Sequence, residues 1–295
     1  MENALSESTV FLQFILNGLI VGGIYALVAL GYTMVYGVLK FINFAHGEVY
    51  MVGGYFGYLL LIHANIPVPI VFPLVALLGG LLGIIIERIA YKPLRKSSRL
   101  APLISALGVS IILQSLVAIL WGSDLRSLQK TVAVQEGVKI WTAYITTLHI
   151  VIIISALILM SAVVIFLKRV RLGKAIRAVS QDMELAQVVG INNDKVIMAT
   201  FGIGSSLGVV AGVLVGLDQG VEPTMGILMG FKAFTASVLG GIGNIQGTIL
   251  AGFLLGVIEN LGAGYLSSEY KNAIAFVVLI LTLLVRPEGI GGKDN

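Results

Sequence analysis

The sequence predicts an all-α polytopic membrane protein, with about 8–9 transmembrane or re-entrant helices in one domain over residues 1–295. Only 12% of its 295 residues are charged and 57% are hydrophobic, and the mean hydropathy is +0.99. A soluble domain carries about 25% charged residues, so much of this surface must face hydrocarbon. Apolar runs recur along the chain, most of them near the roughly 20 residues that cross a bilayer as a helix. They are residues 11–39, 48–63, 68–91, 102–121, 148–168, 197–217, 231–241, 247–265 and 272–286.

Two of these runs depart from the length of a simple span. The run at 11–39 is long enough either to tilt steeply or to break near Gly31 and Gly37. The run at 231–241 is too short to span alone and ends at a cluster of glycines. Non-helical backbone at membrane depth must be satisfied by protein or water, so we expect a broken or re-entrant element inside the bundle.

Basic residues gather in two connections between apolar runs, and this sets the orientation. Positively charged loops stay in the cytoplasm, so both connections are predicted to be cytoplasmic. Counting spans outward places the N-terminus outside and the C-terminus inside. Residues 122–147 then form the largest external segment, where alternation over 131–134 suggests a small β-hairpin. The basic residues are Lys92, Arg95, Lys96 and Arg99 in one connection, and Lys168, Arg169, Arg171, Lys174 and Arg177 in the other.

The composition also excludes several classes of function. Without cysteine, the chain has no disulfide, zinc–cysteine site or thiol nucleophile. Its net charge of +4 lies in short loops, so we expect no nucleic-acid partner. Three scattered histidines without an H-E-x-x-H motif predict neither a metal site nor an enzyme. Gly241-x-Gly243-x-x-x-Gly247 lies between apolar runs without a βαβ unit, so we expect no cofactor.

Glycine recurs at every fourth residue from within the run at 197–217. Helices in lipid associate through close backbone approach, which small residues permit. Because a helix turns every 3.6 residues, this stripe drifts around it and favours a right-handed crossing. We assign the stripe to helix packing, with a bare pore-lining face as the alternative. Its members are Gly204, Gly208, Gly212, Gly216 and Gly220.

Residues 169–196, the longest polar internal segment, predict a cytoplasmic loop that contains an amphipathic helix over 175–190. An anchor on anionic lipid would carry a polar face rich in Lys and Arg. Asp182 and Glu184 interrupt such a face, so the mixed charge favours docking to a protein partner over anchoring to lipid.

Within this loop, Glu184-Leu185-Ala186-x-x-x-Gly190 resembles the EAA-type loop of ATP-binding cassette (ABC) importer permeases, although Leu185 replaces an alanine and no Leu-Pro follows. Four further segments, residues 18–55, 87–114, 232–247 and 265–271, carry the same resemblance. From about residue 11 to about residue 290, the chain resembles the H-type permease subunit of branched-chain amino acid importers. The candidate residues for coupling to an ATPase come from this motif and from the amphipathic segment around it, and they are Arg177, Asp182, Glu184, Ala186 and Gly190.

The resemblance implies a division of labour. The chain would be the non-catalytic permease of an ATP-driven importer for leucine, isoleucine or valine, as a multi-pass protein of the bacterial cytoplasmic (inner) membrane. Its expected partners are a second paralogous permease subunit, two cytoplasmic ABC ATPase subunits, a periplasmic amino-acid-binding protein and membrane lipid. The chain has no G-x-x-x-x-G-K-[ST] loop, which agrees with nucleotide binding by separate subunits.

Polar residues at membrane depth are costly and are therefore candidates for a solute path. Asn43, His46 and Glu48 form the densest group. They could act as a gate, or lie in an interfacial loop where the carboxylate sits near the dipole of the next helix.

Charged residues inside the later runs give a second set of candidates. Glu259 is expected to be buried and paired with Lys232; we favour a structural hydrogen bond of Glu259 to a neighbouring helix, with a place for the pair on the path as the other candidate role. Glu87 adjoins a basic loop, where snorkelling to the interface would suffice.

The residues leave other substrates and one other mechanism open. A permease of the same family could carry urea, amides or other amino acids. An ion-coupled secondary transporter would need a coupling-ion site, and beyond Lys232 and Glu259 the sequence offers little mid-membrane charge for one.

Overall fold

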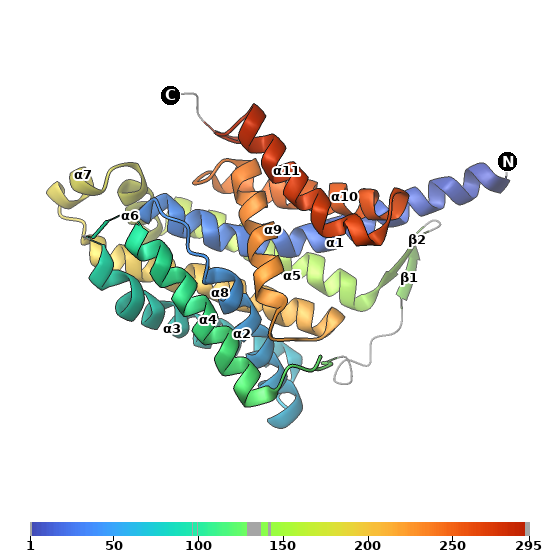
Figure 1. The fold of residues 1–295 in the computed structure, drawn as a ribbon, viewed down its shortest axis with the longest axis horizontal. Coiled ribbons are helices and arrows are strands. Elements are labelled where there is room, and N and C mark those ends of the chain that lie inside the picture. Colours follow the sequence, from blue (N-terminus) through green and yellow to red (C-terminus); the bar gives the residue numbers. More distant parts are fainter. Residues whose placement is uncertain (1, 96, 99, 129–136, 141–142, 293–295) are drawn as a thin grey trace.

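The computed structural model describes residues 2–95, 97–98, 100–128, 137–140 and 143–292. These residues form a bundle of helices with one small hairpin (Figure 1). Among them, 7 helices are long and apolar enough to cross a membrane, by length and composition. The architecture is that of a polytopic all-α membrane protein.

Helix α1 (Glu2–Leu39) is continuous over 38 residues, which corresponds to about 57 Å at 1.5 Å per residue. The predicted alternative of a break near Gly31 or Gly37 is therefore wrong. Gly31 permits close packing instead, because a Cβ there would meet the His46 ring and the Gly204 carbonyl. The N-terminal part of α1 extends beyond the other helices (Figure 1).

The next two helices each end in a π-helical turn. Helix α2 (His46–Tyr58) continues through the turn Leu59–His63. Helix α3 (Val68–Ile86) begins with Pro69 in its first turn, where a backbone N–H has no helical partner to lose. It continues through the turn Glu87–Tyr91, and turns of this kind are frequent at functional sites.

A 3-10 turn (Lys92–Leu94) leads to helix α4 (Leu100–Trp121). Strands β1 (Gly137–Ile140) and β2 (Ala143–Thr146) then form an antiparallel hairpin, with Val138 paired to Ile145. The alternation at 131–134 that suggested a hairpin lies outside the described residues. The hairpin that the structure does describe follows a few residues later.

Helix α5 (Thr147–Arg169) is followed by the predicted cytoplasmic loop, which contains two helices instead of one. These are α6 (Arg171–Gln181) and α7 (Met183–Val188). The expected single helix over 175–190 is wrong because Asp182 adopts an extended conformation, with φ −152° and ψ 112°, and interrupts it.

Helix α9 starts earlier than the apolar run at 231–241 suggested, because its first turns contain two glycines that lower the local hydrophobicity. It is shorter than the membrane-spanning candidates, and its re-entrant character stays a prediction. It ends at Gly240, before Gly241 with φ +87°. The remaining elements are α8 (Asn193–Gln219), α9 (Met225–Gly240), α10 (Ile245–Tyr265), a 3-10 turn (Ser268–Tyr270) and α11 (Lys271–Val285).

Helices α1 and α8 form the centre of the bundle. In their apolar windows 67% and 78% of the residues are buried, against 11% in α4 and 11% in the segment of α11. The outer faces of α4 and α11 expose large apolar side chains such as Ile119 and Leu284. Along the long axis, α6 and α7 lie at one end, and the hairpin and the N-terminus lie at the other (Figure 1).

Candidate translocation path and coupling loop

A cavity of about 380 Å³, here named the α9 cavity, lies between α1, α8 and α9. At one end, Gln219 is the last residue of α8 and Glu222 lies in the connection between α8 and α9, whereas Lys271 begins α11. Tyr25 and Lys232 lie deeper, beside a fully buried carboxylate. The volume falls in the range of about 300–1,000 Å³ typical of small-molecule sites. The apolar wall includes Val21, Ile24, Val215, Met225, Leu228 and Met229.

At the deep end of this cavity, three helices bring together Lys232, Glu259 and Tyr25. Lys232 Nζ forms an ion pair with Glu259 Oε1 and donates to Tyr25 Oη over 3.2 Å. The Tyr25 hydroxyl donates to Glu259 Oε2 over 2.6 Å. Glu259 is fully buried, and a buried carboxylate is costly unless it is paired and hydrogen-bonded. The structure therefore brings the two sequence candidates together, and Tyr25 completes the group.

Asn43 lies in the connection between α1 and α2, His46 and Glu48 lie in the first turn of α2, and all three are buried. Asn43 Oδ1 accepts a hydrogen bond from the Tyr91 hydroxyl over 2.5 Å. Glu48 lies in the first turn of α2, where the helix dipole favours a carboxylate, and its Oε1 accepts from Ser110 over 3.4 Å. The three residues are thus held by contacts with α1, with the π-helical turn after α3 and with α4, and they do not line the α9 cavity.

A second cavity of about 550 Å³, the α6 cavity, lies between α1, α5, α6 and the turn that follows α9. Arg177 and Ser180 of α6 line it, as does Thr33 of α1. Both cavities therefore border α1. The stretch from Ala26 to Leu30 lies between them and is fully buried, so it separates the two.

The glycine stripe of α8 faces the neighbouring helices. Gly220, with φ +88°, borders the α9 cavity, whereas the other four glycines line neither cavity. The pore-lining alternative therefore applies only to Gly220. A Cβ added at Gly204, Gly208, Gly212 and Gly216 would meet, in that order, Gly31, His46, Tyr50 and Val221.

The residues proposed for coupling occupy different positions on α6 and α7. Asp182 caps α7, since its Oδ1 accepts from the amides of Glu184 and Leu185, both over 2.9 Å. Ala186 is buried, and Glu184 is exposed. Gly190 ends the α7 turn with φ +87°, a conformation that favours glycine. Arg177 is separate from these and borders the α6 cavity.

The outer face of α7 exposes three apolar side chains. Leu185, Val188 and Val189 are 61%, 82% and 69% exposed. They lie on a short loop between two candidate spans, at the α6–α7 end of the bundle (Figure 1). An apolar cluster outside the membrane-spanning helices is typical of a protein contact.

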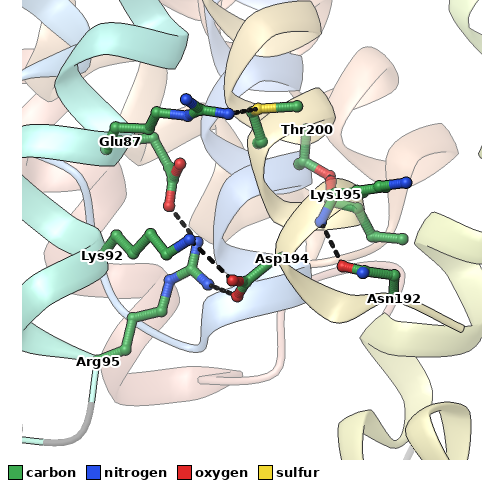
Figure 2. Close-up of polar contacts among 10 residues, drawn as sticks. Glu87, Lys92, Arg95, Asn192, Asp194, Lys195 and Thr200 are labelled. Carbon is green, nitrogen blue, oxygen red and sulfur yellow. Dashed lines mark hydrogen bonds and ion pairs between the residues drawn. The ribbon is translucent and has the colours of Figure 1, made fainter.

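A network of charges joins the end of α3 to the start of α8 (Figure 2). Arg95 lies between Glu87 and Asp194, forming an ion pair with Glu87 and donating to Asp194 over 2.6 Å. Lys92 approaches Asp194 within 2.9 Å. Glu87 is buried, so snorkelling does not describe it. The first basic connection is thereby tied to the first turn of α8.

A family model described as the permease component of branched-chain amino acid transport systems matches residues 14–283. The chain belongs to this family. This permease is 46% identical to the high-affinity branched-chain amino acid transport system permease protein LivH of Salmonella typhimurium, over 97% of this chain and 96% of the relative. It is 43% identical to BraD of Pseudomonas aeruginosa, described in the same words, over 97% of each chain.

A solved structure shows the same fold at much lower identity. PsaBC from Streptococcus pneumoniae, in complex with Fab, matches this permease with a TM-score of 0.53 and 18% identity. The match covers 94% of this chain and 92% of that chain. Together with the candidate spans, the family places the permease as a multi-pass protein of the inner membrane.

Sequence reasoning missed Tyr25 and Arg95 as parts of the permease's buried charge groups. Tyr25 lies 234 positions from Glu259, so no local pattern joins them. The signal for Arg95 was Glu87 itself, because a buried carboxylate needs a cation and Arg95 lies eight positions further along the chain. No group of three or more His, Cys, Asp or Glu that could hold a metal occurs in the described residues.

Proposed function

We propose that this permease forms the membrane path of an ATP-driven importer for leucine, isoleucine and valine. The observation that carries the proposal is the match along almost the whole chain to permeases described as branched-chain amino acid transporters. The apolar wall of the α9 cavity supports the proposal, because moving an aliphatic side chain from water to an apolar surface is favourable. In importers of this family a separate binding protein recognises the solute tightly, so the path through the permease binds the amino acid weakly.

The permease works with four kinds of partner. They are a second paralogous permease subunit, two cytoplasmic ABC ATPase subunits, a periplasmic amino-acid-binding protein and the surrounding lipid. The exposed apolar face of α7 supports contact with an ATPase, and the exposed faces of α4 and α11 support burial in lipid or against the second permease. The permease itself catalyses no reaction, and ATP is hydrolysed by its partners.

The orientation follows from two groups of basic residues, those of α6, which precedes α7, and those of the Lys92–Arg95 turn, which pair with Asp194 at the start of α8 (Figure 2). The α6–α7 end is cytoplasmic, and the α9 cavity opens toward the periplasm. The N-terminus is outside and the C-terminus inside. Gly291 borders the α6 cavity, which is consistent with a cytoplasmic C-terminus.

ATP binding by the partners moves α7 and, through Asp182, α6. Because α6 lines the α6 cavity, its rigid-body displacement opens or closes the cytoplasmic side. The buried stretch of α1 keeps the two cavities apart until both α1 and α9 repack. Access to the path then alternates between the two sides.

The test is purification of the tagged permease in mild detergent from its own membrane, followed by mass spectrometry and reconstitution. We expect two further kinds of subunit, a permease and an ATPase, in stoichiometric amounts. Liposomes with internal ATP and external binding protein should accumulate leucine, and excess isoleucine or valine should compete. A permease that purifies alone and transports without ATP would instead be ion-coupled. Competition by urea or an amide, but not by valine, would reassign the substrate.

A further inference from the structure

The deep end of the α9 cavity holds a cation whose hydrogen-bonding capacity is only partly used. A lysine ammonium has three N–H donors. In the described residues, Lys232 gives one to Glu259 and one to Tyr25. The Tyr25 hydroxyl accepts one of these hydrogen bonds from Lys232 and donates its own hydrogen bond to Glu259. Tyr25 therefore needs no further partner. One Lys232 donor is left over, and Lys232 lines the cavity.

The rest of the cavity restricts what this donor can bind. Apolar side chains flank the approach, and Met225, Leu228 and Lys232 follow one another on a single face of α9 at helical spacing. A ligand must therefore offer an acceptor at one end and an apolar body. Glu259 balances Lys232, and the two other charged residues that line the cavity, Glu222 and Lys271, are opposite in sign, so a net anion would bring an uncompensated charge into the site. A zwitterion has no net charge and avoids this cost.

We propose that the α9 cavity is a binding subsite for the zwitterion of an apolar amino acid. The carboxylate accepts the third N–H of Lys232, and the aliphatic side chain lies on Met225, Leu228 and Met229. The ammonium points toward the end of the cavity that carries Glu222. The inference rests on the proposed function and adds to it the residue that receives the solute.

The geometry explains how such a subsite can be weak and selective together. Lys232 is already held by Glu259 and Tyr25, so little side-chain entropy is lost when a ligand binds. The charge of the Lys232 ammonium is partly neutralised by Glu259, and this weakens the attraction of Lys232 for a second carboxylate. A solute bound in this way leaves readily, as a transport path requires.

The natural chain contains no cysteine, which allows a direct test by single-cysteine protection. Leu228→Cys places a thiol on the cavity wall, and Leu266→Cys places one outside the cavity on an exposed residue at the end of α10. The complete importer is reconstituted in nanodiscs without binding protein and treated with a water-soluble maleimide. Leucine at ten times its Kd should slow the labelling of Leu228→Cys about tenfold. The reason is that bound leucine lowers the fraction of unoccupied sites by a factor of 1 + [L]/Kd.

Two ligands and the control thiol define the specificity. Leucinamide, which lacks the carboxylate, should leave the labelling rate unchanged. Labelling of Leu266→Cys should not respond to leucine. Equal protection by leucine and leucinamide, or protection of both thiols, would overturn the proposal.

A double variant distinguishes binding of the solute carboxylate by Lys232 from the ion pair of Lys232 with Glu259. Lys232→Met alone would strand a buried carboxylate and could unfold the bundle. Lys232→Met/Glu259→Gln removes both charges, and an unchanged size-exclusion profile of the assembled importer verifies its fold. Protection of Leu228→Cys should be lost in this double variant and kept in Lys271→Gln, a cation of the same cavity. The reverse pattern would place the carboxylate on Lys271 and overturn the proposal.

Leucine uptake by the importer with its binding protein is measured in parallel. ATP-driven leucine uptake without any protection of Leu228→Cys would overturn the subsite and leave the proposed function standing. Absence of ATP-driven uptake, with leucine protection intact, would overturn the proposed function and support the subsite.

Discussion

At the scale of single residues, the bundle depends on positions where only a hydrogen fits. A Cβ at Gly212 would collide with the backbone carbonyl of Tyr50, an atom that cannot move without shifting α2. Gly108 on α4 is the opposite case, because nothing lies within 4 Å of a Cβ added there. Alanine substitutions at these two glycines therefore make a matched test variant and control.

We predict that Gly212→Ala lowers the stability of the permease by about 1–3 kcal/mol, the usual cost of overpacking. Gly108→Ala should be neutral or slightly stabilising, because alanine is the better helix former. Size-exclusion chromatography after stepwise heating in detergent measures both. Equal melting temperatures for the two variants would contradict the close α2–α8 packing.

Gly190 illustrates a different constraint, one of backbone conformation without crowding. Its φ is +87°, yet no atom lies within 4 Å of an added Cβ. We predict that Gly190→Trp reaches the membrane but uncouples ATP hydrolysis from leucine uptake, because the turn between α7 and α8 changes shape. Gly190→Asn should retain most coupling, since asparagine tolerates positive φ. Normal uptake by Gly190→Trp would remove this turn from the coupling path.

At the scale of elements, the ion pairs in Figure 2 join two helices that are distant in sequence. Their two halves differ in burial: Glu87 is buried, whereas the Asp194 side chain is 56% exposed. An exposed pair contributes about 0–1 kcal/mol, but removing one partner of a buried pair costs about 3–5 kcal/mol.

Arg95→Met should therefore destabilise the permease far more than Asp194→Asn. The double variant Arg95→Met/Glu87→Gln should recover most of the loss, because it removes the stranded carboxylate. Thermal unfolding in detergent gives the comparison. A double variant as unstable as Arg95→Met would show that Arg95 stabilises through packing and not through Glu87.

Elements also show where sequence reasoning succeeds and where it stops. The long spans were predictable because an apolar run near 20 residues is a local signal that lipid permits in few other structures. The pairing of Lys232 with Glu259 was predictable because isolated charges at membrane depth must find one another. Asp182 carried a readable N-cap signal for α7, which the helical periodicity of its neighbours concealed. The Tyr25 contact depends on how α1 and α10 pack, which no local pattern contains.

At the scale of the whole molecule, the orientation is open to the same single-cysteine approach. We predict that a membrane-impermeant maleimide labels Leu266→Cys in cells with a permeable outer membrane and an intact inner membrane. Val188→Cys, which is 82% exposed on α7, should react only after the inner membrane is opened. Each variant serves as the control of the other. Labelling in the reverse order would invert the orientation and with it the directions assigned to the two cavities.

The buried stretch of α1 between the two cavities bears on the electrical state of the membrane. A potential of 100 mV drives each elementary charge with about 2.3 kcal/mol, so a continuous water-filled pore would conduct protons and ions at all times. Ala26 to Leu30 are wholly apolar and fully buried, so this stretch of α1 offers water and ions no polar side chain between the two cavities. A cell can therefore keep many idle copies of the permease in its membrane without short-circuiting the gradient that powers its other transporters.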